Sequence, residues 1–117
     1  MRFQSEVFMK IKVLDKNNIF DVDYCDNLLS QIRGWMFRIN YKKDGLLFDF
    51  KRVKRVDLHT LFVFDRLDFV WVDSERKVIE IKKNVDNFKF RLKGIEARYL
   101  LELKSSKDLE QNDTLLF

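Results

Sequence analysis

His59 is the only histidine of the chain, and several aspartates stand near it. Residues two positions apart on a β-strand share a face, so Asp57 and His59 can project to the same side. A carboxylate beside an imidazole can orient it as a general base or help it to bind a divalent cation. A lone histidine cannot form a histidine-rich metal site, so we favour a structural histidine bonded to a backbone carbonyl and predict no metal site. The alternative is a metal-dependent or hydrolytic enzyme built on His59 and the neighbouring aspartates, Asp57, Asp65, Asp68 and Asp73.

Asp68 opens an apolar run and shares its strand face with Val70 and Val72. A carboxylate that points to an apolar side needs a partner. Arg33 and Arg98 are the candidates, and we favour a structural arginine–carboxylate pair. The alternative is a polar pocket for a small anionic ligand, lined by Arg33, His59, Asp68 and Arg98.

The densest charge lies in one short segment, predicted to be a loop, whose four cations are Lys51, Arg52, Lys54 and Arg55. Such a loop can contact a phosphate backbone, and exposed aromatic side chains can stack on bases. Trp35, Phe37 and Tyr41 are available for stacking. The more common explanation is a solvated loop, since Asp49 and Asp57 flank it.

The sequence contains no motif that would hold a cofactor. With only 3 Gly it has no glycine-rich phosphate loop, and it has neither a nucleophile elbow nor a His-Glu-x-x-His zinc motif. Cys25 is the single cysteine, which excludes a disulfide framework, and we interpret it as a small packed residue. We therefore expect no cofactor.

Composition indicates one folded domain over residues 1–117. Of the 117 residues, 46% are hydrophobic and 15% are aromatic, enough for a real core. The net charge, 23 − 19 = +4, permits contact with nucleic acid without demanding it. The chain shows neither a bilayer-spanning apolar run nor an apolar signal sequence, so we expect a cytoplasmic protein with no membrane partner.

Alternation of apolar and polar residues dominates the chain and predicts β-strands. A strand at about 2–14, a turn at 15–18 and a partner strand at 19–24 form a hairpin. Asp26, the apolar stripe after it and Gly34 predict a helix of about two turns. Further strands are predicted at 46–50, 58–64, 68–72, 78–81, 88–92, 99–103 and 114–117, with a helical turn within 104–111.

Short strands at close spacing are typical of a small barrel or a curled sheet. The predicted fold is mainly β (α+β): a small, single-domain, antiparallel barrel-like or curled sheet with one or two short helices.

Several segments, in order and spacing, resemble one archaeal and bacterial family, catalogued as domain of unknown function 192. The resemblance covers the chain from about residue 25 onward. His59-Thr60-Leu61-Phe62 followed by Leu67-Asp68 is similar to the family's His-x-Phe-Phe and Ile-Asp segments. The other similar segments are 32–37 (Arg-Gly-Leu-Met in the family), 45–50 (Met-Leu-Phe-x-Phe), 94–102 (Gly-Ala-Arg-Tyr) and 112–113 (Gly-Asp).

The chain departs from the family in two places. Arg66 stands where the family often has Pro, and residues 57–60 replace the Trp-Met-Lys-Asn-Thr run of many bacterial members. A function that depends on that run cannot be carried over. The resemblance implies a mostly β, single-domain fold and implies no known reaction, cofactor or partner.

Three functions remain open. The one we favour is a small binding or accessory module with a polar pocket or a protein-facing surface, because no catalytic constellation is complete. Its partner would be a small anionic ligand or another protein. The alternatives are a nucleic-acid-binding domain that uses the loop at 51–55 and an enzyme centred on His59.

Overall fold

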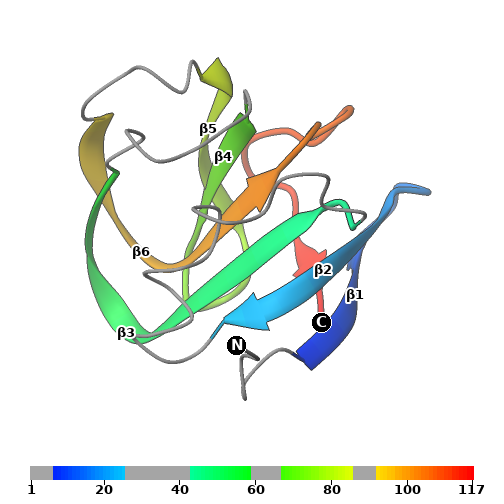
Figure 1. Ribbon diagram of the computed structural model, residues 1–117, viewed down its shortest axis with the longest axis horizontal. Coiled ribbons are helices and arrows are strands. Elements are labelled where there is room, and N and C mark those ends of the chain that lie inside the picture. Colours follow the sequence, from blue (N-terminus) through cyan, green and yellow to red (C-terminus); the bar gives the residue numbers. More distant parts are fainter. Residues whose placement is uncertain (1–6, 26–42, 59–66, 86–91) are drawn as a thin grey trace, which may run out of the picture.

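A computed structural model describes residues 7–25, 43–58, 67–85 and 92–117. These residues include seven strands (Figure 1). The strands are β1 (Val7–Val13), β2 (Ile19–Cys25), β3 (Gly45–Leu58), β4 (Leu67–Val72), β5 (Val78–Val85), β6 (Leu92–Leu103) and β7 (Leu115–Leu116).

The strands make one sheet in the order β5-β4-β6-β3-β2-β1-β7. Every pair is antiparallel except β2 with β3, which run parallel. The sheet curls so far that its two edges are joined through the C-terminal segment: Leu115 pairs with Val13 of β1, while Thr114 bridges Lys77 beside β5. The predicted curled, mainly β fold is confirmed.

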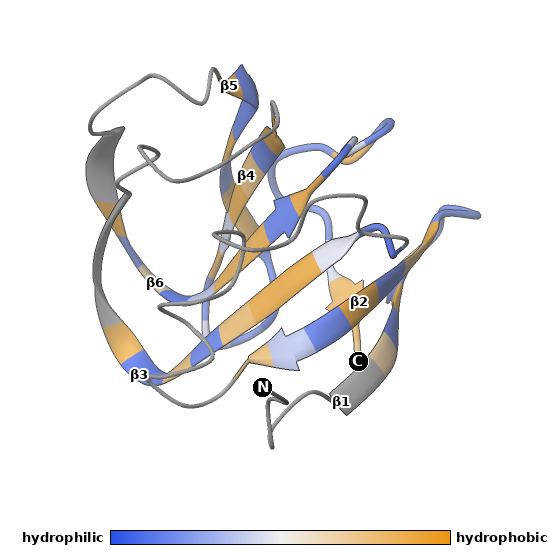
Figure 2. Cartoon of the chain, in the orientation of Figure 1, coloured by the Kyte–Doolittle hydropathy of each residue, from blue (hydrophilic) through white to orange (hydrophobic). Residues whose placement is uncertain are grey.

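The curled sheet buries side chains on both faces, in two separate cores. Val70 and Val72 of β4 belong to the first core, and Phe69 and Trp71 belong to the second. All six residues of β4 are buried, and all of them except Asp68 are apolar. A strand that is buried on both faces needs such a continuous apolar sequence. A hydrophobic stretch is also visible near the start of β3 (Figure 2).

The local sequence explains the conformation of the turn between β1 and β2. Asp15 has a φ of 65°, the left-handed conformation that Asp and Asn tolerate in tight turns. The Lys16 ammonium reaches the carboxylates of Glu110 and Asp113, both at 2.9 Å, and ties the turn to the C-terminal segment. Both hydrogen bonds raise the pKa of Lys16, and the bond to Asp113 has the larger effect.

Most predicted strands within the described residues are confirmed, and β3, β5 and β6 are longer than predicted. The predicted loop at 51–55 is wrong: these residues belong to β3 and pair in part with β6. The predicted helical turn within 104–111 is also wrong, because this segment forms non-helical turns. The predicted helix at 26–34 lies outside the described residues, as do 2–6, 59–64 and 88–91. Within the described part of the chain, no helix is long and apolar enough to cross a membrane.

Gly45 allows β3 and β6 to approach closely. A Cβ atom there would lie 1.9 Å from the backbone carbonyl oxygen of Glu102, a distance that only movement of the strands could relieve. We therefore expect Gly45→Ala to lower the free energy of unfolding by about 3 kcal/mol in urea denaturation. Ser74→Ala, in the exposed turn before β5, is the control and should change it by less than about 0.5 kcal/mol. Equal effects of the two substitutions would contradict this packing.

Candidate anion-binding site

Two of the four residues proposed for a polar pocket lie among the described residues, and the structure does not bring them together. Asp68 pairs with Leu103 at one end of the β4–β6 ladder, whereas Arg98 lies just beyond the Tyr99–Val72 pair at the other end. At about 3.3 Å per residue, roughly 17 Å separates the two positions along β6. The predicted Asp68–Arg98 pair is not formed. Arg33 and His59 lie outside the described residues.

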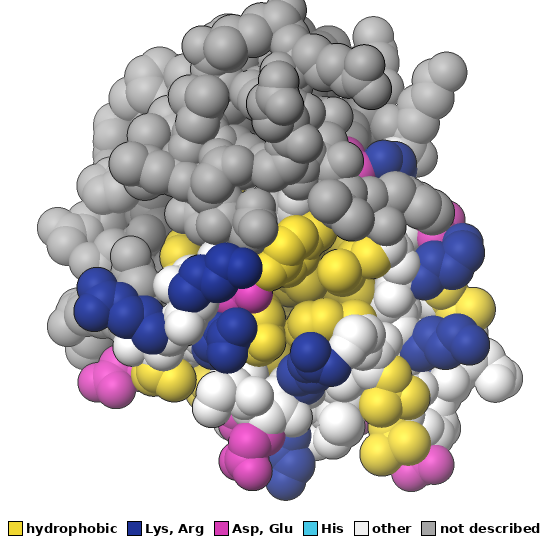
Figure 3. All heavy atoms as spheres, turned by 90° about the horizontal axis from the view of Figure 1, so that it is seen from below, with side chains coloured by type: hydrophobic (Ala, Val, Ile, Leu, Met, Phe, Trp, Pro, Cys, Tyr) yellow, Lys and Arg dark blue, Asp and Glu magenta, His cyan; other side chains and the backbone are white. Residues whose placement is uncertain are grey.

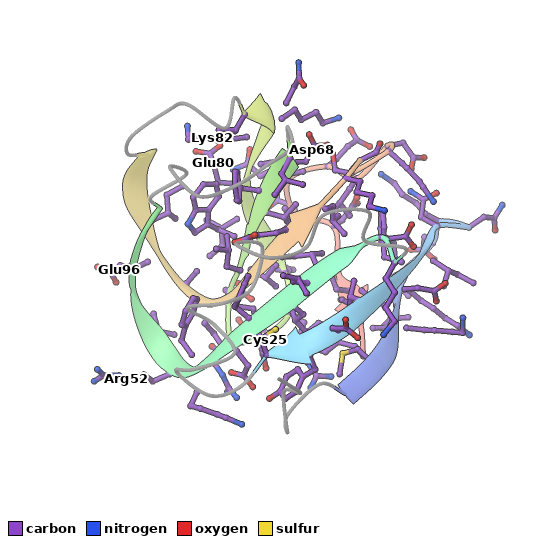
Figure 4. The ribbon with its side chains drawn as sticks, viewed as in Figure 1. Cys25, Arg52, Asp68, Glu80, Lys82 and Glu96 are labelled. Carbon is purple, nitrogen blue, oxygen red and sulfur yellow. The ribbon has the colours of Figure 1, made fainter. Side chains whose placement is uncertain are left out.

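Asp68 is bonded to backbone groups. Its Oδ1 accepts a hydrogen bond from the N–H of Asn84 at 2.7 Å, and its Oδ2 accepts one from the N–H of Ser106 at 2.6 Å. The carboxylate therefore joins the start of β4 to β5 and to the turn after β6 (Figure 4). This arrangement satisfies a buried acid without an arginine and makes Asp68 a structural residue.

Arg98 instead pairs with Asp49, whose side chain is only 5% exposed. The guanidinium donates from Nε to Oδ1 at 3.0 Å and from Nη2 to Oδ2 at 3.3 Å. The hydroxyl of Tyr24 donates to the same Oδ2 at 2.5 Å, and the backbone N–H of Lys51 donates to Oδ1 at 2.8 Å. The Lys51 ammonium lies 3.2 Å from the Tyr24 hydroxyl and 3.9 Å from the carboxylate. We call Tyr24, Asp49, Lys51 and Arg98 the Asp49 cluster.

An interruption of the β3–β6 ladder places these groups side by side. Asp49 pairs with Tyr99, but the next pair joins Lys54 to Ala97, so four residues of β3 face Arg98 alone. Lys51 within this bulge has a φ of 67°, a conformation that residues other than glycine rarely adopt. The bulge turns the Lys51 N–H and ammonium back towards Asp49.

Hydrogen bonding and burial shift the ionisation of the cluster. Burial alone would raise the pKa of Asp49, but hydrogen bonds from Arg98, Tyr24 and the Lys51 N–H outweigh it and hold the pKa below its ordinary 3.8. Burial, reinforced by the adjacent Asp49 carboxylate, raises the pKa of Tyr24. The bond to Asp49 raises the pKa of Arg98. At neutral pH the cluster therefore holds an ionised carboxylate, two cations and a neutral phenol.

Aromatic rings lie next to the charged groups of the Asp49 cluster. The Lys51 ammonium lies 5.5 Å from the Tyr24 ring centroid, and the Arg98 guanidinium lies 4.9 Å from that of Tyr99. Tyr99 meets Phe117 edge to face at 5.2 Å between centroids. Arg76 lies 4.3 Å from the Phe117 ring centroid. Seen from below, hydrophobic side chains gather near the middle of the face, with Lys and Arg side chains to the left, below and to the right of them (Figure 3).

Sequence reasoning found half of the Asp49 cluster. Arg98 was a pocket candidate and Lys51 a nucleic-acid candidate, but they were assigned to different sites. Asp49 and Tyr24 were missed as site residues. A signal existed for Asp49, because it shares its strand parity with the buried Leu47, as Asp68 does with Val70. Nothing local indicated that Tyr24 would meet it, since β2 and β3 come together only in the sheet.

The other predicted groups have mixed outcomes. Lys51 and Arg52 are exposed on β3, and Arg52 points away from the sheet (Figure 4). The positions of Lys54 and Arg55 face Ala97 and Glu96 on β6. Cys25 is buried in the second core, as expected of a packed residue. Among the described residues, no group of three His, Cys, Asp or Glu side chains could hold a metal ion.

A second surface feature lies at the β1–β2 turn. Leu14, Ile19 and Leu116 are each about half exposed and line a depression of about 320 Å³. The depression is open, and the described residues carry nothing that specifies what would cover it. It lies at a different position from the Asp49 cluster, whose residues do not line it.

The seven-stranded curled sheet with this cluster at one end defines a small β half-barrel protein. The sequence profile of the family DUF192, described as "Uncharacterized ACR", matches residues 9–114. The chain belongs to this family, as the order and spacing of the similar segments predicted.

Two solved structures have a similar fold. A protein from Sinorhizobium meliloti, described as a "putative transcription regulator", has a TM-score of 0.85 and 18% identity, over 98% of this chain and 97% of its own. A protein of unknown function from Novosphingobium aromaticivorans has a TM-score of 0.80 and 17% identity, over 94% of this chain and 85% of its own. At these identities the similarity concerns the fold alone. The comparison with curated proteins gave no match.

The substitution Asp68→Asn tests whether both carboxylate oxygens of Asp68 are needed as hydrogen-bond acceptors. Asparagine keeps one acceptor oxygen and places an NH₂ group opposite a backbone N–H, so we expect a loss of about 2 kcal/mol in the free energy of unfolding. Asp73→Asn is the matched control, because Asp73 accepts from the N–H groups of Glu75 and Lys77 through the same Oδ1, which asparagine retains. The control should cost less than about 0.5 kcal/mol. An Asp68→Asn protein as stable as the control would contradict the assignment.

The depressed pKa of Asp49 predicts a pH-dependent contribution to stability. Because the folded-state pKa lies below the ordinary 3.8, the ionised carboxylate stabilises the fold fully above about pH 5. This contribution decreases as the pH falls through the folded-state pKa. The difference in unfolding free energy between wild type and Asp49→Asn should therefore be about 2 kcal/mol near neutral pH and should shrink below about pH 4. Urea denaturation from about pH 3 to pH 7 measures it, and a difference that stays constant would refute the ionised pair.

Proposed function

We propose that this protein is a small binding module that recognises an anionic ligand through Arg98 and Lys51, with Asp49 as the residue that positions them. One observation carries the proposal: a buried carboxylate holds two cations at a partly exposed surface. The side chain of Arg98 is 29% exposed and that of Lys51 is 56% exposed, against 5% for Asp49. The positive groups therefore face solvent while the negative group lies beneath them.

Arg98 keeps donors for a ligand. Its bonds to Asp49 use Nε and Nη2, and its Nη1 makes no hydrogen bond with any residue that the structure describes. A guanidinium held along one edge by a carboxylate can donate to an anion from its other edge. Because its side chain is held before the ligand arrives, less conformational entropy is lost on binding.

The state of the cluster favours binding over catalysis. A tyrosine that acts as a base or nucleophile needs a lowered pKa, and that of Tyr24 is raised. A carboxylate that acts as a general acid needs a raised pKa, and that of Asp49 is lowered. The pocket first proposed from sequence thus keeps Arg98, while Asp68 lies at the other end of β6. Arg33 and His59 remain proposed members of the site, and a cytoplasmic location also remains a proposal.

Nucleic-acid binding through β3 is the second candidate. The exposed Lys51 and Arg52 stand next to each other at the bend of the strand, where a phosphate backbone could contact both. Lys54 and Arg55 follow on the same strand and remain proposed contacts. The S. meliloti protein of similar fold is described as a "putative transcription regulator", which is compatible with this candidate.

A comparison of Arg98→Gln with Arg52→Gln tests the proposal. Both substitutions remove one positive charge, but only Arg98 belongs to the Asp49 cluster. In calorimetric titrations with inorganic phosphate and pyrophosphate at low salt, we expect Arg98→Gln to weaken binding at least about tenfold and Arg52→Gln less than about twofold. Thermal unfolding of each variant before titration verifies that it is folded.

Two results would overturn the proposal. The first is no heat of binding from the wild-type protein with either anion, and the second is an equal effect of both substitutions. A parallel titration with a short single-stranded oligonucleotide tests the second candidate. Steep salt dependence together with a larger loss for Arg52→Gln than for Arg98→Gln would place nucleic acid on β3 instead.

A further inference from the structure

Residues 107–117 connect the two edges of the curled sheet, and we call them the C-terminal strap. On one side, β7 within the strap pairs with the end of β1. On the other side, Thr114 bridges Lys77, and the N–H of Leu115 donates to the carbonyl of Arg76 at 2.8 Å. In Figure 1 the strap is the orange-red segment that leads to the C-terminus. The strap therefore closes a sheet whose other strands are paired without it.

The pairings of the strap are short, whereas those of the central strand are long. β7 has two residues, while β6 pairs with β3 from Leu103 to Leu92 and with β4 from Leu103 to Tyr99. Of the strap's side chains, Leu109 and Leu115 are buried in the first core. Detaching the strap exposes less apolar surface and breaks fewer backbone hydrogen bonds than unfolding β6, so it requires less free energy.

The strap is connected internally and has a fixed point at its start. The N–H of Asp113 donates to the carbonyl of Glu110 at 3.1 Å, and the N–H of Glu110 donates to the Asp113 carboxylate at 2.8 Å. Directly before the strap, the N–H of Ser106 is bonded to Asp68 at the start of β4. Lys107 has a φ of 54°, a conformation that residues other than glycine rarely adopt. A change of backbone angles at Lys107 would swing the strap about Ser106.

One side chain of the β1–β2 turn holds several parts of the strap. The Lys16 ammonium donates to the carbonyl of Asp108 at 2.7 Å and to the carboxylates of Glu110 and Asp113, both at 2.9 Å. The side chain of Asn18 adds a hydrogen bond to the Asp108 carboxylate. Because its three acceptors belong to three residues of the strap, the Lys16 ammonium restrains the strap as a whole.

We propose that residues 107–117 open as one unit about Ser106, with Lys16 as the latch, while the other described strands stay paired. Opening withdraws Leu109 and Leu115 from the first core and uncovers the edge of β1 together with the start of β5. The strap thus acts as a gate to the first core. This inference is independent of the proposed anion site.

Native-state hydrogen exchange measures the opening. Four backbone N–H groups donate across the boundary of the strap, those of Leu14, Val78, Asn112 and Leu115, and we call them the boundary amides. We expect the boundary amides to share one opening equilibrium, at least about tenfold more favourable than that of the β6 amides. Urea should promote their exchange jointly and less steeply than that of β6, because opening exposes less surface than unfolding. Unrelated opening equilibria, or one equal to that of β6, would overturn the proposal.

Two substitutions separate the strap from the rest of the fold. Lys16→Met keeps the alkyl stem but removes the ammonium, and it should promote exchange of the boundary amides at least about tenfold. The β6 amides should change by the same factor, because the latch is lost in the open and the unfolded states alike. Ala97→Gly removes a methyl group from the second core, which stays folded in the open form. It should promote β6 exchange at least about threefold and change the boundary amides less than about 1.5-fold.

Lys10→Met is the matched control for the latch, because Lys10 pairs with Asp21 inside the β1–β2 hairpin. It should change the exchange of the boundary amides less than about twofold. Equal effects of Lys10→Met and Lys16→Met on these amides would refute the role of Lys16. If Ala97→Gly promoted exchange of the boundary and β6 amides equally, the strap would open only when the whole molecule unfolds, and the proposal would fail.

Discussion

The pairing of β3 with β6 is the constraint on which the rest of this structure depends. β6 lies between β4 and β3, so its residues must fit a strand on each side and a core on each face. The close approach at Gly45 anchors this ladder at one end. At the bulge the alternation breaks: Ala97 lies in the second core although Tyr99, two residues later, lies in the first. The same break brings Arg98 and Lys51 to Asp49.

Buried carboxylates in this sheet are satisfied in two different ways. Asp68 accepts a backbone N–H group at each of its two oxygens, and it thereby connects β4 to β5 and to the turn after β6. Asp49 is satisfied by an arginine, a tyrosine and one backbone N–H. Because the cations around Asp49 are only partly buried, its charge orients groups that face solvent. The second arrangement, and not the first, suits recognition of an anion.

Membership of the DUF192 family and the two similar structures define a fold that persists at 17–18% identity. A fold of this kind supports many functions, so the function has to be argued from side chains at a particular place. Here that place is the Asp49 cluster, which is a property of this chain's own residues.

The sequence by itself determined the strands and the hairpin turn, because alternation with a period of two and the turn preferences of Asp and Asn act over a few neighbouring residues. It also identified Arg98 and Lys51 as candidates for binding anions. Their partnership was decided only by the tertiary structure. Asp49 and Arg98 are 49 residues apart and Tyr24 and Asp49 are 25 apart, and these contacts require the strand order, the parallel β2–β3 pair and the register of β3 on β6. Local patterns carry no information on such pairings, so the segment at 51–55 was predicted as a loop although the β3–β6 ladder holds it as a strand.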